Sequence, residues 1–180
     1  MRIAQVNVYF YPFTVGGVEW YVHNISRQLV KLGHEVDVFT TDGHNGSNGE
    51  GLPEEIDGIR INRLPLNFDL TYRLKSWNGL KEKLAEGDFD IIHTYDYAQP
   101  HTFTAINVGK VTHRPVAITV FDVHSLIPRA PWKQLPMKII DRVSAQLALR
   151  KASKVLVRAP NLIPYMVRMG VLQDALEVTP

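Results

Sequence analysis

The residues best suited to chemistry follow two predicted strands, at the point where each strand ends. Histidine, aspartate and serine side chains there could bind sugar hydroxyls, and a histidine or an aspartate could hold a proton near its working pKa. Each has a structural alternative, since an aspartate at a strand end often caps the next helix. Two such groups at matching positions favour a ligand site. The groups are His93, Tyr95 and Asp96 after one strand, and Asp122, His124 and Ser125 after the next.

A pair of glycines, Gly16-Gly17, follows an apolar strand and opens a predicted helix. Glycines at this position let the backbone approach a ligand closely, and the free amides of a first helical turn favour an anion. The chain has no G-x-G-x-x-G, so this is not the dinucleotide fingerprint. The alternative is that the two glycines only shape a turn.

Short apolar runs alternate with helical patterns along the chain. The predicted strands are Ile3–Val8, Val36–Thr40, Ile59–Leu64, Ile91–His93, Val116–Val120, Val155–Val157 and Leu176–Thr179. The predicted helices are Val18–Leu32, Tyr72–Glu86, His101–Lys110, Leu135–Lys151 and Leu162–Met169. This alternation indicates βαβ units in a mainly parallel sheet. We expect one α/β domain over residues 1–180, a Rossmann-like, doubly wound sheet of about seven strands with helices on both faces.

In such a sheet, ligands bind beyond the carboxyl ends of the strands. The site is therefore expected in the loops after Val8, Thr40, His93 and Val120. Two other segments, 41–53 and 125–136, lack periodicity and are predicted to be irregular connections.

Composition and missing motifs exclude several classes of protein. The chain has no cysteine, which excludes disulfides and thiolate metal sites and favours a cytoplasmic location. No apolar run is long enough to span a membrane, and no signal peptide is recognised after Met1. No zinc motif, Walker loop or G-x-S-x-G elbow occurs. The D-x-D at residues 88–90 precedes a strand, on the opposite edge from the expected site, so no metal site is expected.

Basic residues are concentrated in the last third of the chain. The formal net charge is only +2, and no nucleic-acid-binding module is recognisable, so no nucleic-acid partner is expected. Between Arg129 and Arg168, however, nine basic residues accompany one acid, Asp141. This segment could form a peripheral contact with the inner membrane face, together with Leu70, Tyr72, Leu74, Trp77 and Leu80. The alternative is a helix packed on the sheet, with solvated basic side chains.

Several short motifs, in order, resemble those of the retaining GT-B glycosyltransferases of family 4. The opening strand is followed by Pro12 and then Gly16-Gly17-Val18-Glu19, similar to that family's glycine loop. Residues 90–93, Asp-Ile-Ile-His, are similar to its D-[VI]-[VI]-H strand. Further matches are the helix end at Leu29–Val36, the strand entry at Ala152–Val157, and the ending at Met169–Val171 with Glu177–Pro180.

The resemblance implies the N-terminal, acceptor-binding half of a GT-B fold, with the C-terminal nucleotide-sugar domain absent from this chain. It implies transfer of a sugar from a nucleotide-diphosphate sugar, the co-substrate, to a hydroxyl acceptor that is a glycan or lipid-linked, with no cofactor and no obligatory metal. Gly16 and Gly17 match the family's donor-binding glycines. We expect His93, Tyr95, Asp96 and Ser125 to bind the acceptor, and Asp122 and His124 to act in catalysis, with His124 three residues after the position of the family's histidine.

The chain departs from the family pattern in three places. Phe121 stands where the family has a histidine, Arg158 stands in place of a serine, and the chain ends at Pro180, where the second domain would begin. The isolated chain is therefore expected to be inactive and to need the missing domain in cis or in trans. The alternatives are a stand-alone, non-catalytic sugar- or nucleotide-binding module, a subunit of a split enzyme, or a sugar-nucleotide epimerase of similar plan.

Overall fold

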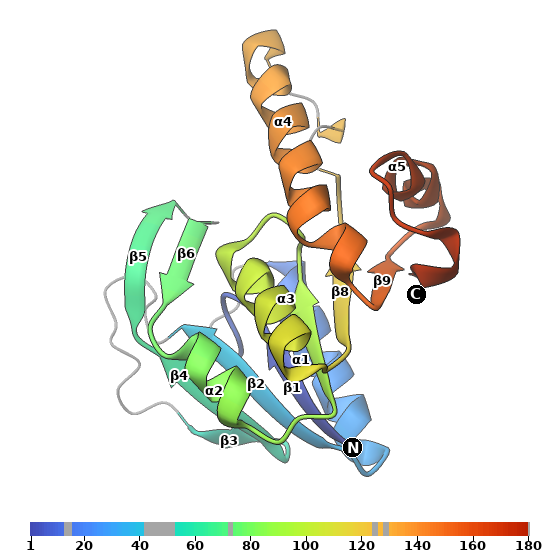
Figure 1. Ribbon diagram of the computed structural model, residues 1–180. Helices are drawn as coiled ribbons and strands as arrows, with labels where there is room; N and C mark the ends of the chain where they lie inside the picture. The colour runs from blue at the N-terminus through green and yellow to red at the C-terminus, as the bar shows by residue number, and fades with distance from the viewer. Residues whose placement is uncertain (13–15, 42–52, 72–73, 124–125, 128–129, 180) are drawn as a thin grey trace.

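Eight strands form one sheet in the spatial order β10-β9-β8-β7-β1-β2-β4-β3 (Figure 1). The computed structural model describes residues 1–12, 16–41, 53–71, 74–123, 126–127 and 130–179. The strands of this sheet are β1 (Arg2–Val6), β2 (Glu35–Thr41), β3 (Glu55–Ile56), β4 (Ile59–Leu64), β7 (Ile91–Tyr95), β8 (Val116–Val120), β9 (Lys154–Val157) and β10 (Leu176–Val178). All seven predicted strands are present, and the eighth is the two-residue β3.

Every neighbouring pair in the sheet is parallel except β3 with β4. The central strands β1, β7 and β8 are buried at nearly every position because both faces of the sheet are covered. Their carboxyl ends lie at one edge, so the loops that follow them meet there. This confirms the expected Rossmann-like arrangement.

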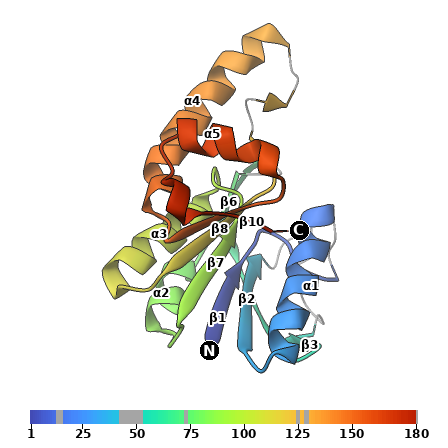
Figure 2. The same ribbon diagram turned by 90° about the vertical axis from the view of Figure 1, so that its right-hand side faces the viewer.

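Helices lie on both faces of the sheet, with α1 on one face and α2 and α3 on the other (Figure 2). Two buried apolar clusters correspond to these faces: one joins Val22 of α1 to Val38 and Ile61, and the other joins Leu84 of α2 and Ala105 of α3 to β1, β7 and β8. The helices are α1 (Gly17–Lys31), α2 (Leu80–Glu86), α3 (Pro100–Thr112), α4 (Pro131–Leu147) and α5 (Ile163–Arg168), with short 3-10 turns at Leu149–Lys151, Pro160–Leu162 and Gln173–Ala175.

The helix predicted over Tyr72–Glu86 is wrong in its first half. A hairpin of β5 (Leu66–Thr71) and β6 (Leu74–Trp77) occupies this region, and the helix begins only at Leu80. In β6, Lys75 and Trp77 are buried, which is the alternation of a strand. Gly79 has a φ of 80°, a left-handed conformation that separates the hairpin from α2.

Two of the five apolar residues of the expected membrane surface around the 70–80 segment are not exposed. Trp77 and Leu80 are buried in the core on the α2 and α3 side of the sheet, and the side chains of Leu70, Tyr72 and Leu74 lie outside the described residues. The predicted irregular segment 125–136 is helical from Pro131 onwards. Within the described part of the chain, we find no helix with the length and apolar character that a bilayer crossing needs.

An ion-pair cluster joins three strands at the amino-terminal edge of the sheet. Arg60 reaches both carboxylate oxygens of Asp37, with Nε 3.0 Å from Oδ1 and a terminal nitrogen 2.9 Å from Oδ2. Arg2 Nε lies 3.1 Å from Oδ2 of the same carboxylate. Burial alone would raise the pKa of Asp37, but the hydrogen bonds from Arg60 and Arg2 outweigh it and hold that pKa below its ordinary value.

Candidate functional site

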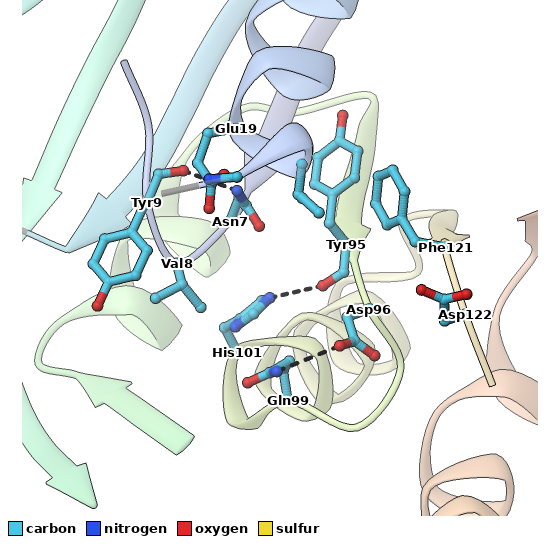
Figure 3. Close-up of a pocket in the computed structure, with 12 residues that line it drawn as sticks. Asn7, Val8, Tyr9, Glu19, Tyr95, Asp96, Gln99, His101, Phe121 and Asp122 are labelled. Carbon is cyan, nitrogen blue, oxygen red and sulfur yellow. Dashed lines mark hydrogen bonds between the residues drawn. The ribbon is translucent and has the colours of Figure 1, made fainter. Parts of the chain in front are cut away.

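A pocket of about 170 Å³ opens at the edge of the sheet where the strands end. It lies between the segment after β1, the amino end of α1, and the segments after β7 and β8 (Figure 3). Its lining residues are Asn7, Val8, Tyr9, Gly16, Val18, Glu19, Tyr95, Asp96, Gln99, His101, Phe121 and Asp122. The pocket therefore lies where the sequence predicted the site.

The amino end of α1 forms one wall of the pocket through Gly16 and Glu19. Glu19 is buried in the first turn, and its Oε2 accepts a 2.9 Å hydrogen bond from the amide of Gly16. An acidic side chain here also interacts favourably with the helix dipole. A Cβ added at Gly16 would meet only Glu19 Oε2, at 3.7 Å, and one at Gly17 would meet nothing within 4 Å. Packing within the described protein therefore does not require either glycine.

Beneath the floor of the pocket lies a buried network of hydrogen-bonded side chains from three neighbouring strands. Tyr95 lines the pocket, and its hydroxyl donates a 2.6 Å hydrogen bond to Gln5 Oε1. His93 lies deeper, with Nε2 2.8 Å from Thr119 Oγ1 and Nδ1 3.4 Å from the Tyr95 hydroxyl. Burial raises the pKa of Tyr95 well above its ordinary value, with a smaller effect of Tyr21, and burial lowers the pKa of His93 to about 4. Both side chains are therefore neutral near pH 7.

The turn between β7 and α3 supplies Asp96 and Gln99 to the polar lining. Asp96 has a φ of 65°, an uncommon conformation for a residue other than glycine. Its carboxylate accepts hydrogen bonds, each 3.4 Å long, from the amide of Ala98 and from Gln99 Nε2. The left-handed backbone at Asp96 lets the chain turn sharply from the strand into α3. This brings Gln99 and His101 back over the end of β7.

His101 carries an unpaired acceptor that is buried beside this pocket. Its Nε2 lies 3.1 Å from the carbonyl oxygen of Tyr95, which can only accept, so Nε2 carries the proton. Nδ1 is then an acceptor, and it has no hydrogen-bond partner among the described residues. Its ring stacks on Trp77 with a centroid distance of 5.3 Å. Burial lowers the pKa of His101 to about 4, against smaller opposing effects of the hydrogen bond to Tyr95 and the charge of Asp96.

Phe121 and Asp122 form the wall contributed by the segment after β8. The ring of Phe121 meets Tyr21 edge-on, with centroids 5.3 Å apart, and it packs with the apolar cluster on the α1 face. The carboxylate of Asp122 lies beside the pocket without that packing (Figure 3). An apolar ring thus occupies the position at which the family resemblance expects a histidine.

The structure brings four predicted site residues together at the pocket: Gly16, Tyr95, Asp96 and Asp122. Gly17 is the next residue along α1, and His93 lies beneath Tyr95 without lining the pocket. His124 and Ser125 lie outside the described residues. Their roles stay predictions.

Sequence reasoning did not single out Asn7, Tyr9, Gln99 or His101, although all four line the pocket. Asn7 and Tyr9 lie at the end of the first predicted strand, where polar residues were expected to matter. His101 gave no signal, because it was the first residue of a predicted helix. Among the described residues, no three histidine, aspartate or glutamate side chains lie close enough to hold a metal ion.

Residues 16–180 match the family model of the glycosyl transferase 4-like domain. The chain belongs to this family. It is 30% identical over 133 residues to an uncharacterized glycosyltransferase of Methanocaldococcus jannaschii, a match that covers 69% of this chain and 31% of that protein. It is 27% identical over 181 residues to O-antigen chain mannosyltransferase C of Escherichia coli, covering 100% of this chain and 45% of that protein. The glycosyl transferase 4-like chain thus spans less than half the length of these relatives.

A solved structure shows the same fold. The Anabaena protein HepE, crystallised in complex with UDP-glucose, superposes with a TM-score of 0.64 at 17% identity, covering 99% of this chain and 43% of that one. The fold of this glycosyl transferase 4-like domain is therefore that of one Rossmann-like half of a GT-B protein, as the sequence predicted.

Proposed function

We propose that the protein containing this chain transfers a sugar from a nucleotide-diphosphate sugar to a hydroxyl acceptor, and that this chain supplies the acceptor-side, N-terminal half of the cleft. The observation that carries the proposal is the pocket itself, which places the amino end of α1 opposite the polar turn after β7. One wall can take an anion, and the other can bind hydroxyl groups.

The donor would approach Gly16 and Gly17. Among the described residues, only Glu19 comes within contact distance of a Cβ at either glycine, so a diphosphate or a sugar can approach the backbone there. The amides of the first turn of α1 and the helix dipole favour negative charge at this place. In the Anabaena protein HepE, crystallised with UDP-glucose, the ligand is a nucleotide-diphosphate sugar, which supports the proposal for this chain.

The acceptor would bind on the side formed by the turn after β7. The carboxylate of Asp96 lines this side and can accept a hydrogen bond from a hydroxyl group, beside the buried ring of His101. Tyr95 and the deeper His93 hold the floor in place. Asp122, with its carboxylate beside the pocket, is the proposed catalytic group, and His124 and Ser125 are proposed to contribute from the same loop.

We infer that residues 1–180 alone transfer sugar only negligibly. The pocket is open. The relatives are more than twice as long as this chain, and a nucleotide-binding domain in the additional length would complete the pocket. Stabilisation of a leaving diphosphate is weak in an open, wet site. The reaction is proposed to proceed without an obligatory metal ion, on the cytoplasmic side.

The test is sugar transfer by the full-length protein, assayed as release of nucleoside diphosphate from a panel of nucleotide-diphosphate sugars, with and without EDTA. Asp122→Asn is expected to lower kcat by at least about 10²-fold, the scale of a lost catalytic group. Asp88→Asn is the matched control, since Asp88 is exposed at the other edge of the sheet. Donor binding without any turnover would favour the non-catalytic module, and equal losses in both variants would contradict the role of Asp122.

A further inference from the structure

Helix α4 carries a row of exposed apolar side chains along one side. Trp132, Leu135, Ile139, Val143 and Leu147 are between 45% and 74% exposed, and they recur at spacings of three and four residues. We call these five residues the α4 stripe. In both overall views the amino-terminal part of α4 extends beyond the sheet, past the edge where the strands end (Figures 1 and 2). Such a row on a helix is normally covered.

A second pocket, of about 390 Å³, lies between α4 and α5 and is rich in positive charge. Four basic side chains line it: Lys138, Arg142, Arg150 and Arg168. None of the four forms an ion pair in the part of the chain that the structure describes. We call this the α4–α5 pocket.

The single carboxylate of the α4–α5 pocket does not cancel this charge. Asp141 is buried, and its Oδ1 accepts a 2.5 Å hydrogen bond from the hydroxyl of Tyr97. The exposed basic groups therefore outnumber it by four to one at the pocket wall. The guanidinium of Arg168 lies over the ring of Tyr165, 5.7 Å from its centroid, which keeps that charge within the pocket. An anion is the ligand that fits this charge.

The stripe and the basic pocket lie on adjacent sides of the same helix. Lys138 precedes Ile139 by one residue and Arg142 precedes Val143 by one residue, so each cation is rotated by about 100° from its apolar neighbour. Both cations therefore form a row that runs parallel to the apolar row, on the side of the stripe that faces α5. A ligand that spans both rows must join an anionic group to an apolar body.

We propose that the α4–α5 pocket binds the phosphate groups of an anionic phospholipid surface, into which the α4 stripe inserts. The apolar row would contact the acyl region, and Lys138, Arg142, Arg150 and Arg168 would contact lipid phosphates at the level of the head groups. The charge of the pocket decides for an anionic lipid surface over a second copy of the chain, whose own α4–α5 pocket would bring like charges together. The proposal does not depend on the sugar-transfer reaction.

The test measures binding of the full-length protein to vesicles of phosphatidylcholine alone and of phosphatidylcholine mixed with phosphatidylglycerol. Wild-type protein should bind the mixed vesicles at low salt and dissociate as salt rises. The double variant Lys138→Gln/Arg142→Gln should bind about 25-fold more weakly, at about fivefold for each cation near the surface. Ile139→Gln/Val143→Gln should weaken binding by about tenfold or more, because two apolar side chains that would insert into the bilayer are lost.

Two matched controls separate these effects from a general change of charge or hydropathy. Lys81→Gln/Lys83→Gln removes two exposed lysines of α2, and Val111→Gln removes an exposed apolar residue of α3. Both should bind like wild type. No binding to mixed vesicles at low salt would overturn the proposal, as would equal losses in the control and pocket variants. Release by soluble glycerol phosphate would assign the pocket to free phosphate instead, and a stripe variant that only lowers the molecular mass in solution would assign the stripe to a second copy.

Discussion

Gly16 and Glu19 are joined across the first turn of α1 by a 2.9 Å hydrogen bond from the Gly16 amide to Glu19 Oε2. This bond uses one of the amides that a helix leaves free at its amino end. It therefore fixes the loop while the next amides stay available to a ligand. The buried carboxylate is part of the pocket wall and of the helix cap at the same time.

Glu19→Ala should lower the free energy of unfolding by about 1 kcal/mol, the usual cost of losing a helix cap. Glu19→Gln should lower it by less than half of that, since its amide oxygen can still accept from Gly16. Urea denaturation of both variants measures the difference. Equal stability of Glu19→Ala and wild type would show that the bond does not hold the cap.

Gly16→Ala and Gly17→Ala should leave stability nearly unchanged while weakening donor binding by about tenfold. The added methyl groups have room in the protein, and alanine is the better helix former at position 17. They would occupy the space proposed for the donor. Calorimetric titration with a nucleotide-diphosphate sugar and thermal unfolding separate the two effects.

Gly109→Ala is the matched control for the two site glycines. Its Cβ would lie 2.3 Å from Val116 Cγ2 and 2.9 Å from the carbonyl oxygen of Arg114, so it should destabilise the fold by about 1–3 kcal/mol. Donor affinity measured on the folded fraction should not change. Unaltered donor binding by Gly16→Ala would argue against donor approach at that residue.

The stability of the protein should fall as the pH is lowered from 7 to 5. Burial lowers the pKa values of His93 and His101 to about 4. In the unfolded chain these histidines therefore bind protons once the pH falls below their ordinary pKa of about 6.5, while in the folded chain they do not. Protons thus favour the unfolded state, by on the order of 2 kcal/mol for each histidine over this range.

Replacing His101 by Asn should make the dependence on pH less steep over the same range. Urea denaturation at several pH values gives the slope for wild type and for the variant. His113→Asn is the control, because the side chain of His113 is partly exposed at the end of α3. An unchanged slope in His101→Asn would mean that His101 is protonated in the folded protein.

Asp37→Asn should destabilise the protein at pH 7 by about 1–2 kcal/mol, since it leaves Arg2 and Arg60 without their buried partner. The pKa of Asp37 is lowered by folding, so its contribution is present above its ordinary pKa and is lost as the pH falls through the folded value. The difference from wild type should therefore shrink in acid.

Glu35→Gln is the control for Asp37→Asn. Glu35 bonds the same Arg60 at 2.9 Å, but its side chain is 66% exposed, and such pairs contribute little. The variant should lose less than about 0.5 kcal/mol. A loss as large as that of Asp37→Asn would show that burial of the carboxylate is not what matters. The cluster lies away from the pocket, so donor binding should not change in either variant.

The sheet could be predicted because its strands are short apolar runs, such as Val116–Val120, that suit a sheet covered on both faces. The segment around Trp77 was mispredicted because its apolar residues fit a helical spacing as well as a strand. In the structure Trp77 stacks on His101, a contact far along the chain that the local pattern does not show.

The site was predictable where residues follow strands directly, as Asp96 and Asp122 do. His101 could not be found this way, because it reaches the pocket through the left-handed turn at Asp96. The membrane surface predicted around the 70–80 segment was wrong at Trp77 and Leu80 for a related reason. Hydropathy does not show which side of an amphipathic segment the rest of the fold covers.

The segment 121–123 lies between two pockets and contributes side chains to both. Asp122 lines the pocket at the end of the strands, and its neighbour Val123 lines the α4–α5 pocket. The turn after β7 is divided in the same way, since Asp96 faces the first pocket and Tyr97 holds Asp141 of the second. A substitution in either partition reshapes two cavities at once. Substitutions at the outer walls, at Gly16 for one cavity and at Arg168 for the other, therefore complement the Asp122→Asn test.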